Sequence, residues 1–250
     1  MEPVPSSNRV GFEFRFRFRL WPALAAALGI ALTVALGGWQ LTRAKHKEAL
    51  RERSLELGRE PPVMLGAEPV QAARLAWRRV EVRGRFEARF MVYLDNRVHR
   101  HRPGYHVVTP LQIAGSRKYV LVNRGWIAAT ADRTRPPQVA TPAEEIVVRG
   151  VAHAPTGRFL ELSTKVTEGN VWQNLALERY RAVTGLDVHP IVVQQEGESG
   201  DGLVREWPAP DFGRNTHLAY AFQWFALAVA IFVGYLALHV RRRTPASGTR

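Results

Sequence analysis

The clearest pattern in this sequence that could bind a cofactor begins at His217. Tyr220 and Trp224 follow it three and seven residues later, so on a helix the imidazole and the two aromatic rings share one face. An imidazole nitrogen can ligate iron, and flat side chains can flank a planar ring, which is what a haem needs. A polar histidine within an aromatic belt at a membrane surface is the other interpretation, and the residues alone favour it.

Two apolar segments without charged side chains must position these residues. Leu20–Thr42 and Leu218–Leu238 are each long enough to cross a hydrocarbon core of about 30 Å. Basic residues precede the first segment and follow the second, which by the positive-inside rule places both termini in the cytoplasm, although basic residues also follow the first segment. The expected layout is a basic and aromatic cytoplasmic tail over 1–19, a transmembrane helix over 20–42, a periplasmic α+β domain over 43–217, a second transmembrane helix over 218–240 and a cytoplasmic tail over 241–250.

This topology brings the outer ends of the two spans to one depth. Trp39, Gln40 and Arg43 end the first span and therefore face the same layer as His217. Arg43 would supply a cation for the propionates of a haem.

Small residues at four-residue spacing predict that the two spans pack closely. The residues expected at the contact are Ala27, Ala31 and Ala35 in the first span and Ala226, Ala230 and Gly234 in the second.

The N-terminal tail alternates phenylalanine with charged residues from Phe12 to Arg19. Because no partner strand is evident nearby, we expect an extended or interfacial anchor, with rings in the headgroups and arginines in water.

Composition narrows the class of protein. The chain has 250 residues, a net charge of +13 and no cysteine. Much of the positive charge lies beside the spans, where it serves topology and anionic lipid rather than nucleic acid. The absence of cysteine excludes disulfides and thiolate metal sites.

The middle of the chain predicts an α+β domain of mostly antiparallel strands, which a barrel would close. A helix is expected over 43–57 and another over 175–183, with strands at 80–86, 90–94, 105–113, 118–126, 146–154 and 191–195.

Catalytic signatures are missing: the sequence has no P-loop, GxSxG, HExxH or GxGxxG motif, so we do not expect an enzyme. A histidine cluster raises the question of a metal site, but its neighbouring cations would repel a metal ion and favour a basic surface loop. The cluster comprises His99, His101 and His106, interleaved with Arg97, Arg100 and Arg102.

Two glycine-containing motifs are expected to support the fold. Asn123-Arg124-Gly125-Trp126 predicts a sharp exit from a strand, because Asn and Gly tolerate positive φ and Trp126 offers a large area to bury. Gly84 interrupts an alternating strand, which indicates a bulge or the close approach of a neighbouring strand.

The order of these pieces resembles the surfeit locus protein 1 family of cytochrome oxidase assembly factors. The similar segments are Gly38-Trp39-Gln40-Leu41 with Arg43, Val82-Arg83-Gly84-Arg85-Phe86, Tyr105-His106-Val107-Val108-Thr109-Pro110, Val122-Asn123-Arg124-Gly125-Trp126, and Asn215-Thr216-His217-Leu218-Ala219-Tyr220 with Trp224. One departure is His46-Lys47, which stands where the family often has a Trp-Lys pair.

The resemblance implies a role in oxidase biogenesis in the bacterial inner membrane. It implies transient binding of haem a, with His217 as the iron ligand, and delivery to the oxidase catalytic subunit. Haem a synthase is a further partner to consider, together with membrane lipid. The alternative is a membrane scaffold that stabilises oxidase assembly intermediates without holding haem.

Overall fold

The computed structural model describes residues 14–16, 19–130, 132, 135–154, 167–208 and 213–242. The chain divides into two units, residues 1–51 with 211–250 and residues 52–210. We call them the helical unit and the barrel domain and describe each by itself. Most of the predicted tails 1–19 and 241–250 lies outside the described residues.

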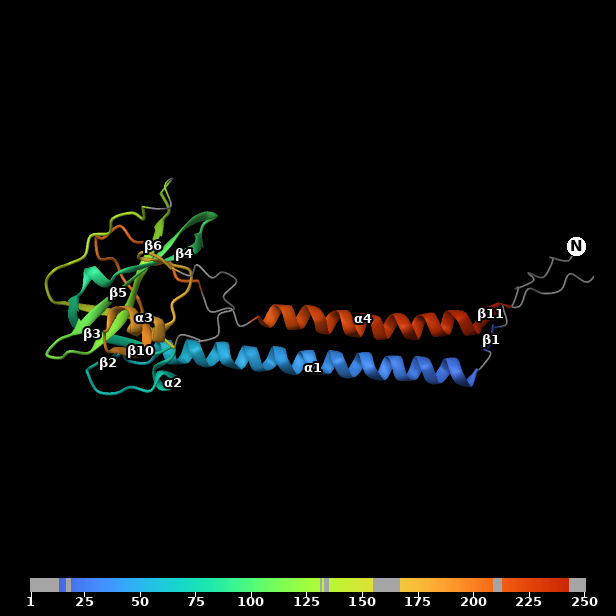
Figure 1. Cartoon of the computed structure of the whole chain (residues 1–250). Helices are drawn as coiled ribbons and strands as arrows, with labels where there is room; N and C mark the ends of the chain where they lie inside the picture. The colour runs from blue at the N-terminus through green and yellow to red at the C-terminus, as the bar shows by residue number, and fades with distance from the viewer. Residues whose placement is uncertain are drawn as a thin grey trace, which may run out of the picture. The chain divides into compact units, whose positions relative to one another are not determined.

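Two helices dominate the helical unit: α1 (Leu20–Arg59), whose last turns belong to the barrel domain, and α4 (Arg214–His239) (Figure 1). Each is long and apolar enough to cross a membrane by length and composition. The helix expected over 43–57 is confirmed as a direct continuation of α1. Alanine, leucine and long charged side chains favour that continuation.

The two helices pack through small residues, but not through the predicted ones. Gly37 lies so close to α4 that an added Cβ would sit 2.8 Å from the Phe225 ring. Thr33 is buried on α1, as is Ala228 on α4. Five of the six predicted residues are instead exposed: Ala27, Ala31, Ala35, Ala226 and Ala230.

The predicted contact face was therefore wrong, for a geometric reason. Gly37 follows Ala35 by two residues, which is about 200° around an α-helix. Gly29, Thr33 and Gly37 have the same four-residue spacing as the predicted alanines. Spacing does not choose between the two stripes, and glycine allows the closer approach.

A short strand pair links the segment before α1 to the segment after α4. β1 (Phe14–Phe16) pairs antiparallel with β11 (Val240–Arg242), with Phe14 opposite Arg242. This corrects the expectation that the N-terminal segment has no partner strand. The rest of the predicted aromatic segment, at residues 12, 13, 17 and 18, lies outside the described residues.

A closed five-stranded barrel forms the centre of the barrel domain. Each strand pairs with the next, and β3 also pairs with the last strand, which closes the ring. In order around the barrel the strands are β3 (Arg79–Phe86), β7 (Ile146–His153), β10 (Val188–Gln195), β6 (Tyr119–Ala128) and β5 (Arg102–Ile113). Among these pairs only β10–β6 is parallel, so the prediction of a mostly antiparallel α+β domain is confirmed.

Shorter elements surround the barrel. β2 (Val63–Met64) lies beside β3, and β4 (Val92–His99), β9 (Val171–Trp172) and β8 (Thr167–Glu168) extend the sheet beyond β5. The helices are α2 (Ala72–Leu75), the 3₁₀ turn η1 (Ala88–Phe90) and α3 (Leu177–Thr184). The strand predicted at 90–94 starts later because η1 occupies its first position.

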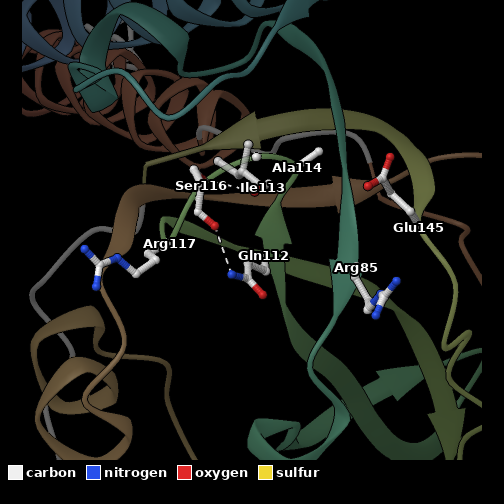
Figure 2. Close-up of a pocket in the computed structure, with 8 residues that line it drawn as sticks. Arg85, Gln112, Ile113, Ala114, Ser116, Arg117 and Glu145 are labelled. Carbon is white, nitrogen blue, oxygen red and sulfur yellow. Dashed lines mark hydrogen bonds between the residues drawn. The ribbon is translucent and has the colours of Figure 1, made fainter.

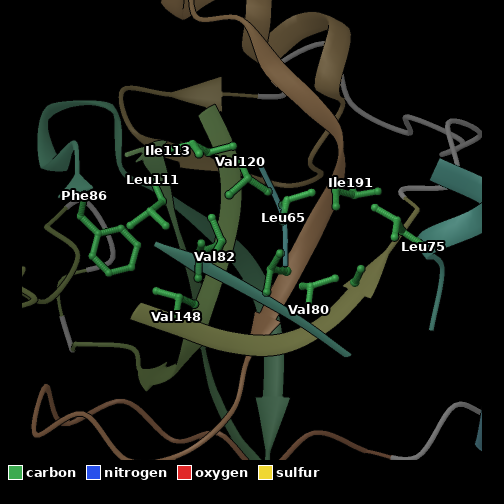
Figure 3. Close-up of a cluster of buried hydrophobic side chains, with 13 residues drawn as sticks. Leu65, Leu75, Val80, Val82, Phe86, Leu111, Ile113, Val120, Val148 and Ile191 are labelled. Atoms are coloured by element: carbon green, nitrogen blue, oxygen red, sulfur yellow. The ribbon is translucent and has the colours of Figure 1, made fainter. Parts of the chain in front are cut away.

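Alternating residues of the barrel strands point inward to form the main core (Figure 3). Val80 and Val82 of β3 meet Ile191 of β10 there, and all three are fully buried. A second cluster lies under α3, where the Tyr180 hydroxyl donates a hydrogen bond to the Phe90 carbonyl at 2.8 Å. The barrel thus has a packed interior rather than a channel.

Gly84 lies where β3 reaches both of its neighbours in the barrel. It pairs with Ile146 of β7 and with Ile113 of β5. A Cβ at this position would overlap the carbonyl oxygen of Gln112. The close approach expected at Gly84 is confirmed.

Replacing Gly84 should therefore destabilise the barrel. We expect Gly84→Ala to lower the free energy of unfolding by about 1–3 kcal/mol, because the methyl group forces β3 and β5 apart. Gly66→Ala is the control, since an added Cβ there meets no atom within 4 Å. Thermal melting of the purified proteins measures both, and equal melting temperatures for the two variants would contradict the closure argument.

The contact between α1 and α4 can be tested by comparing two faces of α1. Gly37→Leu should lower the amount of protein in the membrane and its resistance to proteolysis, because the side chain collides with Phe225. Ala35→Leu adds the same bulk on the exposed face and should change neither quantity. If immunoblots of membranes showed less of the Ala35→Leu protein than of the Gly37→Leu protein, the alanine face of α1 predicted from the sequence would be the contact face.

Candidate functional site

His217, in the first turn of α4, forms a hydrogen bond with Gln40 of α1. The Nδ1 atom lies 2.8 Å from the Gln40 Oε1 atom. An amide oxygen can only accept, so Nδ1 is the donor, and in a neutral imidazole this leaves the lone pair on Nε2. Histidines that ligate metals are commonly held in this way by a partner on the other ring nitrogen.

The other predicted residues lie on the same two helices. The Arg43 guanidinium lies over the Trp39 ring, 5.6 Å from its centroid. Trp39 and Tyr220 are 52% and 49% exposed, and Trp224 is half-buried. The structure thus brings Gln40 to His217 and Arg43 to Trp39, whereas Tyr220 and Trp224 make no ring contact with any described residue.

The Asn123–Trp126 motif is a bulge inside β6, so the predicted end of a strand was wrong. Val107 of β5 lies opposite Gly125 and Val108 lies opposite Asn123, which leaves Arg124 as the extra residue. Gly125 has a φ of +146°, whereas Asn123 does not adopt positive φ. The bulge continues the strand and redirects the Arg124 side chain.

Arg124 is almost fully buried, at 1% exposure, and holds two loops to the barrel. It donates hydrogen bonds to Thr141 Oγ1 at 2.8 Å, to the Ala140 carbonyl at 2.7 Å and to Asp201 Oδ2 at 3.0 Å. Burial alone would raise the pKa of Asp201, but hydrogen bonds from Arg205 and Ser199 lower it below its ordinary value. These contacts support a structural role for the motif.

Sequence reasoning missed a pocket of about 540 Å³ in the barrel domain. Two ring pairs line it. Trp77 meets His153 edge to face at 4.6 Å, and Trp207 meets His106 in the same manner at 5.4 Å. We call these four residues the tryptophan–histidine pocket; a smaller hollow of about 260 Å³ shares His106 and Trp207 with it.

No sequence pattern could have identified this pocket, because its residues come from four separate segments. Trp77 precedes β3, His106 lies on β5, His153 ends β7 and Trp207 follows β10. A motif needs fixed spacing, and only the fold brings these rings together. The one hint of such a pocket in the sequence was the presence of several tryptophans and histidines, the residues that could bind an aromatic ligand or a metal in a domain without cysteine.

A third hollow, of about 510 Å³, lies at the turn between β5 and β6 (Figure 2). Gln112 Nε2 donates a hydrogen bond to the Ser116 carbonyl at 2.9 Å, and Arg85 and Arg117 lie apart from each other. The lining has no aromatic side chain. This hollow is therefore a poorer candidate for an organic ligand than the tryptophan–histidine pocket.

Comparison with known proteins now decides the family. The SURF1 family profile matches residues 27–229. The chain belongs to the SURF1 family.

Relatives in bacteria and animals align with most of this SURF1-family chain. A SURF1-like protein of Rickettsia conorii is 29% identical over 211 residues, covering 82% of this chain and 85% of the relative. The mouse Surfeit locus protein 1 is 26% identical over 233 residues, with 85% and 74% covered. A SURF1-like protein of Drosophila melanogaster is 30% identical over 224 residues, with 80% and 71% covered.

The histidine cluster of this SURF1-family chain is divided between a turn and the pocket. Arg100 and His101, with φ of +46° and +64°, form a tight hairpin turn between β4 and β5, rather than the predicted loop. His99 Nε2 lies 3.5 Å from Glu206, and His106 lines the pocket. Within the part of the chain that the structure describes, no three His, Asp or Glu residues are grouped to hold a metal ion.

The two pocket histidines are neutral at pH 7. Burial, aided by the charge of Arg97, lowers the pKa of His106 to about 4. Burial also lowers the pKa of His153, against an opposing hydrogen bond with Gln194. A neutral imidazole is the form that binds a metal.

The depressed pKa of His106 predicts loss of stability in acid. The unfolded chain takes up a proton near the ordinary pKa of about 6.5, while the folded chain does so only near 4. Stability is therefore fully present above about pH 6.5 and falls as the pH drops toward about 4. His106→Phe should make the decline in melting temperature over this window shallower, with His153 accounting for part of what remains.

His101→Asn is the matched control, since it removes an exposed histidine and Asn tolerates the positive φ. It should leave the pH dependence of the melting temperature unchanged. If His106→Phe followed the wild-type curve at every pH, His106 would not titrate as stated.

Proposed function

We propose that this chain is an assembly factor for haem–copper cytochrome oxidase that binds a-type haem and passes it to the catalytic subunit. Membership of the SURF1 family supports the oxidase context. The hydrogen bond between Gln40 and His217 carries the haem assignment. It joins residues from the two ends of the chain and leaves a histidine nitrogen available for iron.

In this proposal different side chains contact different parts of the haem. His217 offers Nε2 to the iron, because Nδ1 is engaged by Gln40. Arg43 pairs with a propionate as a charge-assisted partner. Trp39 and Tyr220 supply flat apolar surface beside the ring. Once in the oxidase, the haem supplies the redox centre.

An open site suits a carrier that must release its ligand. Small-molecule sites that retain a ligand bury about 70–90% of its surface. Trp39 and Tyr220 are both about half exposed, so neither belongs to an enclosing wall. A haem held mainly by one imidazole and one arginine would therefore be passed on more readily than one in a closed pocket.

The proposal places the protein in the bacterial inner membrane as a carrier and not an enzyme. Both termini would lie in the cytoplasm and the barrel domain in the periplasm, where the oxidase catalytic subunit would receive haem a. Haem a synthase is the proposed source of the cargo, and membrane lipid surrounds α1 and α4. The length and apolar composition of both helices support this location.

Purification from a host that makes haem a tests the iron ligand. His217→Ala should abolish absorbance in the Soret region while leaving the amount of protein in the membrane unchanged. Gln40→Leu should bind haem about 10–100-fold more weakly, as expected when the partner that orients a ligand is lost. His46→Ala, an exposed histidine on α1, is the control and should keep the wild-type haem content.

Two results would contradict the proposal in different ways. A Soret band that survives His217→Ala would mean that the ligand lies elsewhere. Haem-free wild-type protein, together with loss of assembled oxidase when the gene is deleted, would favour the scaffold that holds no haem.

A further inference from the structure

The tryptophan–histidine pocket has the size and walls of a site for a planar organic ligand. Its volume of about 540 Å³ lies within the range of about 300–1,000 Å³ typical of small-molecule sites. Trp77 and His153 line it as one ring pair, and His106 and Trp207 as another. Aromatic walls favour a flat aromatic ligand through stacking and edge-to-face contact.

Trp77 is fixed in place by an unusual backbone conformation. Its φ is +70°, a left-handed value that costs a bulky residue of the order of 1–3 kcal/mol. Its backbone N–H donates a hydrogen bond to the Ala152 carbonyl at 2.7 Å, which anchors it to β7. The ring is therefore positioned before any ligand arrives.

His106 also has a side-chain amide as its partner, but with the opposite polarity to His217. Its Nδ1 atom lies 3.3 Å from the Asn123 Nδ2 atom, an N–H donor, so in this arrangement Nδ1 accepts. The Asn123 oxygen is buried and makes no hydrogen bond with any described residue. Turning the Asn123 amide by 180° would bring that oxygen to Nδ1, so that the oxygen gains a donor, the proton stays on Nδ1 and Nε2 keeps a lone pair.

The charges at the pocket favour an anionic ligand. Arg59 and Arg79 line it, and Glu196 is its one carboxylate. Arg79 lies 3.5 Å from Glu196, whereas Arg59 forms no ion pair with any described residue. Arg59 is thus available to a carboxylate on the ligand, in the geometry that guanidinium groups favour.

We propose that the tryptophan–histidine pocket is a second binding site, for a flat aromatic molecule bearing carboxylates, the class that includes porphyrins. Trp77 and Trp207 contact the ring, Arg59 pairs with a carboxylate and His106 contacts a metal at the ring centre when one is present. The choice of porphyrins rests on the proposed function. The site itself uses none of the residues assigned to haem on α1 and α4.

Porphyrin titration of the full-length chain tests this site alone. The protein carries His217→Ala, is reconstituted haem-free in lipid nanodiscs and receives coproporphyrin, a water-soluble tetracarboxylate, with or without iron. We expect saturable binding of both forms by fluorescence and absorbance. Arg59→Gln and Trp207→Leu should each weaken it about tenfold, equivalent to about 1.4 kcal/mol.

His106→Phe separates metal contact from ring binding. It should leave the affinity for metal-free coproporphyrin within about twofold and abolish the shift of the Soret band that the iron form shows. A merely structural role for His106 would lower both signals together and would overturn its assignment.

Two controls account for the loss of a positive charge and for the partition of the porphyrin into lipid. Arg53→Gln removes an exposed arginine from the same helix without touching the pocket, and empty nanodiscs report binding to lipid. Absence of saturable binding, or equal weakening by Arg53→Gln and Arg59→Gln, would overturn the second site. Either result leaves the proposed function standing if the purified wild type carries haem. Conversely, coproporphyrin binding without copurified haem would support the pocket and count against the proposed function.

Discussion

Closure of the sheet between β3 and β5 is the constraint on which the barrel domain depends. β3 can reach both β7 and β5 only because Gly84 has no side chain to meet the Gln112 carbonyl. An open sheet would expose one edge of β3 and leave the inward valines facing water, whereas the closed one buries them around Ile191. Closure also places the candidate pocket, since β5 carries His106, β7 carries His153, and β3 pairs with both strands.

The bulge at Arg124 fixes two loops outside the barrel to the barrel strands. Burying a guanidinium is unfavourable unless most of its donors are satisfied. Here the two terminal nitrogens donate to Asp201 and to oxygens of residues 140 and 141, while Nε makes no hydrogen bond with any described residue. Asp201 also accepts from Arg205 at 2.6 Å, and the intervening Val204 exchanges backbone hydrogen bonds with Trp126. These contacts fix the segment that leads directly to Trp207, so a residue of the structural motif helps to shape the pocket without lining it.

The sequence predicted well those features that a pattern within a single helix or strand encodes. Apolar length identified α1 and α4, and alternation identified the barrel strands, because both signals lie within one element. The contact face of α1 was missed because Gly37 and Ala35 both belong to stripes of small residues. The β1–β11 pair and the rings of the pocket were missed because each joins distant segments. The segment around Arg124 was predicted to end a strand because a β-bulge and the end of a strand favour similar residues. Only the pairing register between β5 and β6 distinguishes the two.

The two histidines with amide partners differ in a way that bears on carrying a ligand. His217 meets Gln40 beside exposed aromatic residues, whereas His106 meets Asn123 in a pocket whose burial holds its pKa near 4. At both histidines Nδ1 is engaged by an amide group, but the two environments differ in how much of a bound ring they can shield from water. An apolar ring gains about 25 cal/mol for each Å² removed from water, so the site that buries more of a ring would hold it more strongly. A haem carrier would need both properties at different times, so under the two proposals retention would belong to the barrel domain and transfer to the helices.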